Sequence, residues 1–156
     1  MKFKTTVALG AASLLAATFA FADSHVDPAI AGAIKARQAH MDLYAFNLGT
    51  LGAMAQENIP YDADAAAAAA GNLAMLASLN QSNYWPQGSD TSIEGSRALP
   101  ALWENIPDAI AKGEALATAA AALAEVAGTD LASLQGAFGP VGGACGDCHR
   151  AYRQSN

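Results

Sequence analysis

Two cysteines and a histidine near the end of the sequence, Cys145, Cys148 and His149, constrain the fold more than any other feature. They are spaced as C-x-x-C-H, and on a helix positions i, i+3 and i+4 share one face. Two thiols on that face could add to the vinyl groups of a haem while the imidazole reaches its iron. This spacing is the attachment signature of a c-type haem. The fold must therefore place a C-terminal helix beside a space that holds one covalent haem c.

Other uses of the two cysteines fit the sequence less well. A redox C-x-x-C motif belongs to a βαβ unit, and no strand pattern precedes Cys145. A structural zinc site needs four ligands, and the other histidines, His25 and His40, lie at the far end of the chain. A disulfide is compatible with an exported protein but gives His149 no role. Covalent haem is the interpretation that uses all three residues.

The first residues predict export. Lys2 and Lys4 precede an apolar run and a small-x-small cleavage site that ends at Ala22. This order is typical of a secretory signal peptide, and the run is short for a membrane span. We expect residues 1–22 to be the signal peptide and residues 23–156 to form one exported domain without a membrane span.

The charge balance limits the partners. Without the expected signal peptide, six basic residues stand against fourteen acidic ones, a net charge near −8 with neutral histidines. Such a balance argues against binding to nucleic acid or to anionic membranes. It favours solubility and attraction to basic redox partner proteins.

The remaining sequence is rich in Ala and Leu and poor in β-branched residues, which is typical of helices. Asp27 as N-cap and Pro28 at the first helical position mark the start of the first helix. Pro107 predicts a kink or a restart, and Gly139-Pro140 predicts a kink or a break. Four helices are expected, at about residues 28–55, 62–79, 100–127 and 130–153.

A long irregular segment at residues 80–99, with Trp85-Pro86, Gly88 and Gly95, separates the second expected helix from the third. Four helices with one long crossover predict an all-α, antiparallel four-helix bundle, whose core is a natural cofactor site. The second helix carries the alanine tract 65–70, and such faces allow close helix approach. This helix is therefore a candidate for a homodimer interface.

The first expected helix offers a group for the opposite side of the iron. Ile34, Met41 and Leu48 recur every seven residues, which marks an inward seam. The Met41 thioether could bind the iron, or Met41 could be a core side chain that only covers it. Arg37 lies one turn earlier and could reach a haem propionate, the alternative being a solvated surface cation.

Other polar residues receive simpler interpretations. His40 points about 100° away from Met41, so it is interpreted as a surface or interface histidine. His25 lies just beyond the expected cleavage point. Tyr152 is expected in the core. Arg153 lies four residues after His149 and is either a cation near the haem or one that stabilises the helix C-terminus.

On the basis of these residues, the sequence resembles the cytochrome c′ family, the class II cytochromes c. The resemblance implies an antiparallel bundle, often dimeric and periplasmic, with haem attached through Cys145 and Cys148 and with Arg37 and Gln38 nearby. It covers most of the sequence beyond the signal peptide and rests on the haem motif with residues 150–153, on residues 139–142, on Pro100 to Trp103, on Ile34 to Gln38 and on Pro60 to Ala63.

The family contains high-spin members, which bind nitric oxide and carbon monoxide, and low-spin members of the cytochrome c-556 type, which carry electrons. Met41 falls on the position where low-spin members place a ligand and some high-spin members place a blocking methionine. The long segment 82–99, and Leu99 in place of a basic residue, favour the low-spin branch.

Three functions follow in order of preference. The first is one-electron transfer with His149 and Met41 as axial ligands of iron. The second is binding of nitric oxide or carbon monoxide at five-coordinate iron. A peroxidase ranks last, because it needs distal acid–base groups and the seam offers Met41. The chain is therefore predicted to be an electron carrier or a gas-binding protein rather than an enzyme.

Overall fold

The computed structural model describes residues 26–155, so the expected signal peptide and His25 lie outside the described part. Within it, no helix is both long and apolar enough to cross a membrane. The elements are α1 (Pro28–Ala55), α2 (Ala63–Ser78), the 3-10 turn η1 (Ser82–Tyr84), α3 (Ala101–Glu104), α4 (Ile106–Val126) and α5 (Leu131–Tyr152). The four long helices form the expected all-α bundle, and α3 is a single turn before α4.

An aspartate caps the N-terminus of three of the four long helices. The side chains of Asp27, Asp62 and Asp130 accept hydrogen bonds from the first turns of α1, α2 and α5. Such caps satisfy amide groups that have no partner inside the helix. The fourth start, that of α4, has no side-chain cap and carries Pro107 in its first turn. Of the two outcomes expected at Pro107, the structure shows the restart.

Pro140 does not break α5, which is continuous from Leu131 to Tyr152. A proline inside a helix leaves the carbonyl four residues earlier without its partner. Here that carbonyl belongs to Gly136, and both Gly136 and Pro140 lie at exposed positions where water can satisfy it. The break allowed by the sequence is therefore absent, and the haem motif stays on the same helix as the core residues before it.

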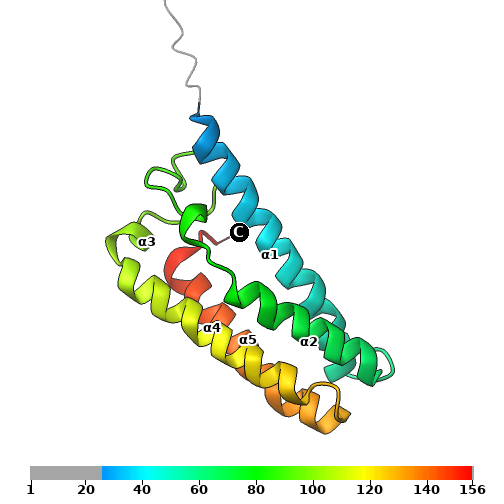
Figure 1. Ribbon diagram of the computed structural model, residues 1–156. Helices are drawn as coiled ribbons and strands as arrows, with labels where there is room; N and C mark the ends of the chain where they lie inside the picture. The colour runs from blue at the N-terminus through cyan, green and yellow to red at the C-terminus, as the bar shows by residue number, and fades with distance from the viewer. Residues whose placement is uncertain (1–25, 156) are drawn as a thin grey trace, which may run out of the picture.

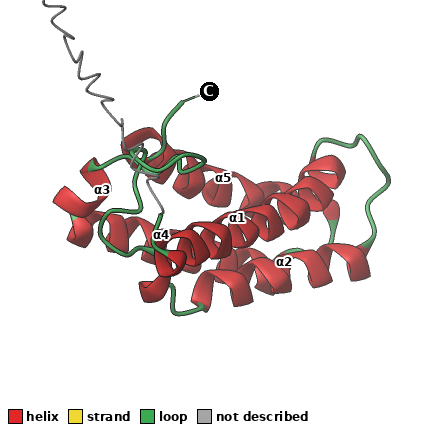
Figure 2. Cartoon of the chain, turned by 90° about the horizontal axis from the view of Figure 1, so that it is seen from above, coloured by secondary structure: helices red, strands yellow, loops and turns green. Residues whose placement is uncertain are grey.

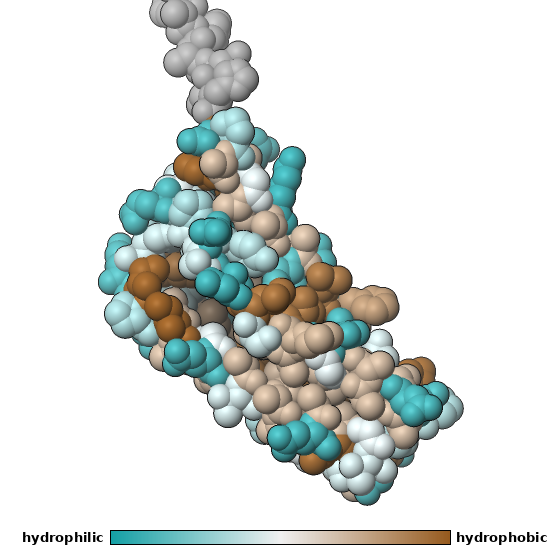
Figure 3. Space-filling view, in the orientation of Figure 1, coloured by the Kyte–Doolittle hydropathy of each residue, from teal (hydrophilic) through white to brown (hydrophobic). Residues whose placement is uncertain are grey.

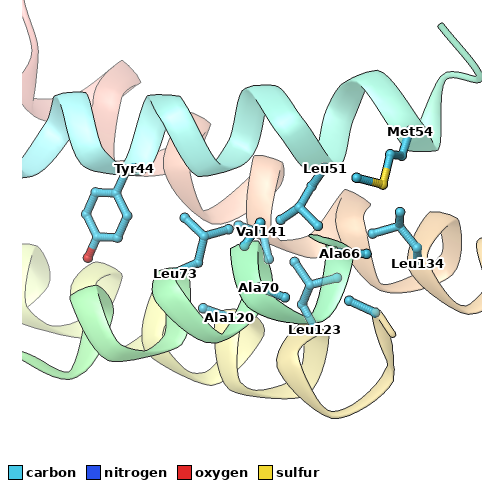
Figure 4. Close-up of a cluster of buried hydrophobic side chains, with 12 residues drawn as sticks. Tyr44, Leu51, Met54, Ala66, Ala70, Leu73, Ala120, Leu123, Leu134 and Val141 are labelled. Carbon is cyan, nitrogen blue, oxygen red and sulfur yellow. The ribbon is translucent and has the colours of Figure 1, made fainter. Parts of the chain in front are cut away.

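The helices alternate in direction along the length of the bundle (Figure 1). Residues 79–100 and the C-terminal tail gather at one end, beside α3 (Figure 2). The largest fully buried apolar side chains lie at the centre and come from all four long helices: Leu51, Leu73, Leu123, Leu134 and Val141 (Figure 4). Each such side chain contributes about 1.5–3 kcal/mol to folding. In Figure 4, Tyr44 stands at one end of this cluster, apart from the leucines.

The alanine tract of α2 serves the interior. Ala66, Ala69 and Ala70 are buried, and they belong to the same cluster as Ala120 and Leu123 of α4. Small side chains let these two helices approach closely. The described structure thus uses the inner face of the tract for contacts inside the chain.

The turn between α4 and α5 also approaches α2 closely. A Cβ on Gly128 would lie 2.9 Å from Cβ of Ala67 and 3.2 Å from the carbonyl oxygen of Ala63. We expect Gly128→Ala to lower the free energy of unfolding by about 1–3 kcal/mol, because backbone must move. The matched control is Gly136→Ala, where a Cβ meets nothing within 4 Å. It should be neutral or stabilise by about 0.5–1 kcal/mol. Urea unfolding checks both, and equal stability of the two variants would contradict this packing.

Candidate haem site

The haem motif lies on the last turns of α5. Cys145 and Cys148 are both half-buried free thiols. Burial raises the pKa of each thiol, so both are protonated at neutral pH. His149 follows one residue later with an exposed side chain. Two reduced thiols and an imidazole thus share one helical face, as covalent attachment of a haem requires.

The electrostatics around His149 suit a metal ligand. Desolvation lowers the pKa of His149, and the positive charge of Arg153 lowers it further. The imidazole is therefore neutral at neutral pH, the form that binds iron. The helix end is fixed by Tyr152, which is buried as expected and donates a hydrogen bond to Asp108 of α4. That hydrogen bond is the main reason that the pKa of Tyr152 is raised to about 12.

Two sides of α1 face inward, because two helices pack against it. Asn72 of α2 donates a hydrogen bond of 3.0 Å to Asn47, which marks the side toward α2. A Cβ on Gly52 would lie 3.3 Å from Cζ of Phe138 in α5, which marks the side toward α5. Sequence periodicity alone could not separate these two directions.

Helical spacing assigns His40 and Met41 to different sides. His40 lies one heptad before Asn47 and therefore faces α2, whereas Met41 lies about three turns before Gly52 and faces α5. The side chain of Met41 is 37% exposed. Position 41 therefore lies on the side of α1 toward the helix that bears the haem motif, with its side chain partly open to solvent.

The other members of the expected seam are interior residues. Ile34 is buried, and Leu48 packs against the core cluster. Arg37 is also buried, with 5% of its surface exposed, so it is not a solvated surface cation.

The interpretation of His40 as a surface or interface residue is wrong, because only 4% of it is exposed. Its ring packs edge-on against Tyr44, with centroids 4.6 Å apart, and against Tyr84 at 5.8 Å. Burial lowers its pKa, and its Nε2 atom has no hydrogen-bond partner within residues 26–155. The error came from treating α1 as a helix with a single inward direction.

Two contacts fix the register of α1 against the antiparallel α5. Gly52 lies against Phe138, and nearer the end of α1, Nε2 of Gln135 donates a hydrogen bond of 2.9 Å to the carbonyl of Ala55. Burial, with a smaller contribution from Cys145, raises the pKa of Tyr44 to about 12. Because the two helices are antiparallel, residues nearer the start of α1 lie beside residues nearer the end of α5.

Arg37 and Gln38, the residues expected near the haem, both hold the irregular segment. Arg37 donates to the side-chain and main-chain oxygens of Ser89, to Oγ of Ser96 and to the carbonyl of Tyr84. Gln38 donates to the carbonyl of Gly95 at 2.8 Å. No ion pair of Arg37 with a carboxylate is present among the described residues.

Sequence reasoning missed Ser89 and Ser96, which are buried acceptors for Arg37. A signal was present, because each serine follows a glycine with positive φ, Gly88 at 79° and Gly95 at 83°. Such glycines form tight turns that bring backbone close to a partner. Tyr44 was also missed, although it lies one heptad after Arg37.

The surface beside the motif is hollowed and apolar. Figure 3 shows a hollow between the C-terminal end of α2 and the start of α4, and Figure 1 shows the last turns of α5 behind it. Exposed apolar side chains lie on these two segments: Met75, Leu79, Ile106 and Ile110. Exposed apolar groups around a concave surface are typical of a ligand site.

The residues present fit a haem. Two free thiols and a neutral imidazole could supply its attachment, and the hollow could supply apolar walls. Among the residues that the structure describes, the buried hydroxyl of Tyr44 and Nε2 of His40 have no hydrogen-bond partner. Buried polar atoms are normally satisfied, so these two mark a place where a further group is expected.

Comparison with known proteins agrees with this geometry. The family model of cytochrome c′ matches residues 32–153. Cytochrome c-554 of Cereibacter sphaeroides is 48% identical over 124 residues, which cover 79% of this chain and 81% of that protein. Cytochrome c-556 of Agrobacterium fabrum is 36% identical over 79% of this chain and 82% of its own length.

Solved structures give the same result. Cytochrome c′ from Rhodobacter sphaeroides superposes with a TM-score of 0.79 at 35% identity, covering 81% of this chain and 98% of that one. Another cytochrome c′, described as having ligand-controlled dimer dissociation, superposes with a TM-score of 0.75 at 30% identity, covering 85% and 100%. The chain therefore belongs to the cytochrome c′ family, whose covalent haem c fits the two thiols and the imidazole of α5.

Proposed function

We propose that this protein carries single electrons, with Cys145 and Cys148 tethering haem c and with His149 and Met41 as the two axial ligands. Bound haem supplies the one-electron chemistry at iron. The chain supplies the ligands, the apolar surroundings and the fixed charges that set the reduction potential. Histidine and methionine together are the ligand pair typical of electron-carrying c-type cytochromes.

The register of α1 and α5 carries this proposal. Gly52 of α1 and Phe138 of α5 lie at one level of the bundle. About three turns lead from there along α1 to Met41 and along the antiparallel α5 to His149. Met41 also belongs to the side of α1 that faces α5. A thioether and an imidazole at the same level of two facing helices are suited to bind opposite faces of one haem.

Binding of nitric oxide or carbon monoxide at five-coordinate iron is the second candidate. The partial exposure of Met41 favours it, because a side chain that only covers the iron need not be held tightly. The likeness to a structure of cytochrome c′ is compatible with either function.

The ferric spectrum of the haem-loaded protein separates the two candidates. Electron transfer with Met41 bound predicts low-spin bands and a far-red sulfur-to-iron charge-transfer band, together with slow carbon monoxide binding by the reduced protein. High-spin bands and fast carbon monoxide binding would contradict Met41 ligation and support the second candidate.

We also propose a periplasmic location, on the basis of the export signal expected at residues 1–22. With a net charge near −8 after removal of that signal, redox partner proteins with a basic docking face are favoured. Electrostatic attraction of this kind predicts electron-transfer rates that fall as ionic strength rises.

We propose that a homodimer forms through the outer face of α1. Leu43 and Phe46 are 51% and 72% exposed there, and exposed apolar side chains of this size favour a protein interface. Phe46→Glu should raise the dimer dissociation constant at least about 30-fold, because a buried aromatic anchor is replaced by a charge. Ile59→Glu, at another exposed apolar residue, is the control. Sedimentation over a concentration series measures both, and an unchanged Phe46→Glu dimer would exclude this face.

A further inference from the structure

Residues 82–99, which we call the strap, connect α1 to the end of α5. On the α1 side, the strap is held by the buried guanidinium of Arg37 and by Gln38. The same guanidinium lies over the ring of Trp85, with its Cζ 5.0 Å from the centroid. A buried charge is costly unless oxygen acceptors surround it, so this anchor depends on the serines and carbonyls of the strap.

The other end of the strap is fixed to the segment after the haem motif. Leu99 donates its amide to the carbonyl of Tyr152 at 2.9 Å, and Gln154 donates its amide to the carbonyl of Arg97 at 2.8 Å. Between these bonds, Ala98 forms an isolated β-bridge with Arg153. Trp103 donates to the carbonyl of Trp85, which ties the strap to α3 as well.

Hydrogen bonds within the strap also stabilise it. Oγ of Ser96 donates to the carbonyl of Ser89, and the amide of Thr91 donates to the carbonyl of Ala98. The α1 anchor and the tail anchor are therefore parts of one hydrogen-bonded unit. Loss of the hydrogen bonds of Ser89 or Ser96 should therefore weaken the hydrogen bonds between the strap and the tail.

The positions of the two anchors relate the strap to the iron site. Arg37 lies one turn before Met41 on α1, and Tyr152 lies about one turn after His149 on α5. The direct α1–α5 contacts described above lie nearer the other end of the bundle: Gly52 with Phe138, and Gln135 with the carbonyl of Ala55. At the haem end, the strap supplies the connection.

We propose that the strap fixes the spacing between α1 and the end of α5, with Ser89 and Ser96 as positioning residues that keep Met41 at the iron. This rests on the proposed ligation by Met41. When the strap is anchored, Met41 and His149 are held at a separation that both axial bonds can span. When the anchor on Arg37 is lost, α1 moves more freely and Met41 leaves the iron more often.

The test compares haem-loaded wild type, the double variant Ser89→Ala with Ser96→Ala, and the control Ser82→Ala. Ser82 belongs to the same segment but its side chain is exposed. The double variant should weaken the far-red band, and carbon monoxide should bind the reduced protein about 10-fold faster or more, as expected for lost buried hydrogen bonds to a charged group. Ser82→Ala should stay within about twofold of wild type.

A second readout follows the strap itself. Amide hydrogen exchange at Leu99 and Gln154, whose amides form the hydrogen bonds between the strap and the tail, should accelerate about 10-fold in the double variant and stay unchanged in Ser82→Ala. If the double variant does not fold, Ser96→Ala alone should shift both readouts in the same direction by a smaller factor.

The outcomes distinguish the two proposals. A wild-type protein without the far-red band contradicts Met41 ligation, and with it the proposal that the strap keeps Met41 at the iron. A double variant with unchanged carbon monoxide binding overturns the strap proposal. Faster exchange with an unchanged band and rate overturns it too, because the segment would then only complete the fold.

Discussion

Replacing both Cys145 and Cys148 with serine is expected to abolish covalent haem attachment completely. Serine hydroxyls do not form the thioether bonds that the two thiols supply, whereas the imidazole of His149 remains able to bind iron. Haem staining of a denaturing gel should therefore be negative for the double variant. Any haem that it does bind should be removed by acid–acetone extraction.

The single variant Cys148→Ser is the matched control, because it retains one thiol. It should keep haem on a denaturing gel and show an altered haemochrome band. A double variant that still carries haem after extraction would show that other residues form the attachment. Both thiols are half-buried in α5, which is a continuous helix. The same variants therefore also show whether α5 folds without its covalent bonds to haem.

Replacing Met41 with alanine is expected to convert a low-spin protein to a high-spin one. In the wild type, carbon monoxide binds only the small fraction of molecules in which Met41 has left the iron. If that fraction is about 1%, removal of the thioether raises the apparent affinity about 100-fold. Stopped-flow mixing of the reduced protein with carbon monoxide measures the effect.

The control for this prediction is Ile59→Ala. Ile59 is 42% exposed in the connection between α1 and α2, so truncation of an apolar side chain there should leave the spin state and the carbon monoxide rate as in wild type. A Met41→Ala protein with an unchanged spectrum would mean that Met41 only covers the distal face.

Local signals made most of the fold predictable. The Asp27 cap followed by Pro28 gave the start of α1, and Asp130 gave that of α5, because a cap acts on the amides of its own first turn. The effect of Pro140 could not be predicted, since a helix tolerates it only when the freed carbonyl of Gly136 is exposed. That exposure depends on how α5 packs against the other helices.

The site was predictable where its residues are close in sequence. Cys145, Cys148 and His149 share one helical face whatever surrounds them. The partners of Arg37 were not predictable, because Ser89 and Ser96 lie 52 and 59 residues away from it. The burial of His40 was missed for a related reason, since it depends on α2 and α5 packing on two sides of α1.

The proton spectrum of the reduced, haem-loaded wild-type protein tests the axial pair most directly. With Met41 bound opposite His149, ferrous iron is diamagnetic, and the methyl group over the ring is displaced far upfield of all ordinary protein signals. That resonance should be present in the wild type and absent from Met41→Ala. A wild-type spectrum without it, with the broad shifted lines of high-spin iron, would contradict the account.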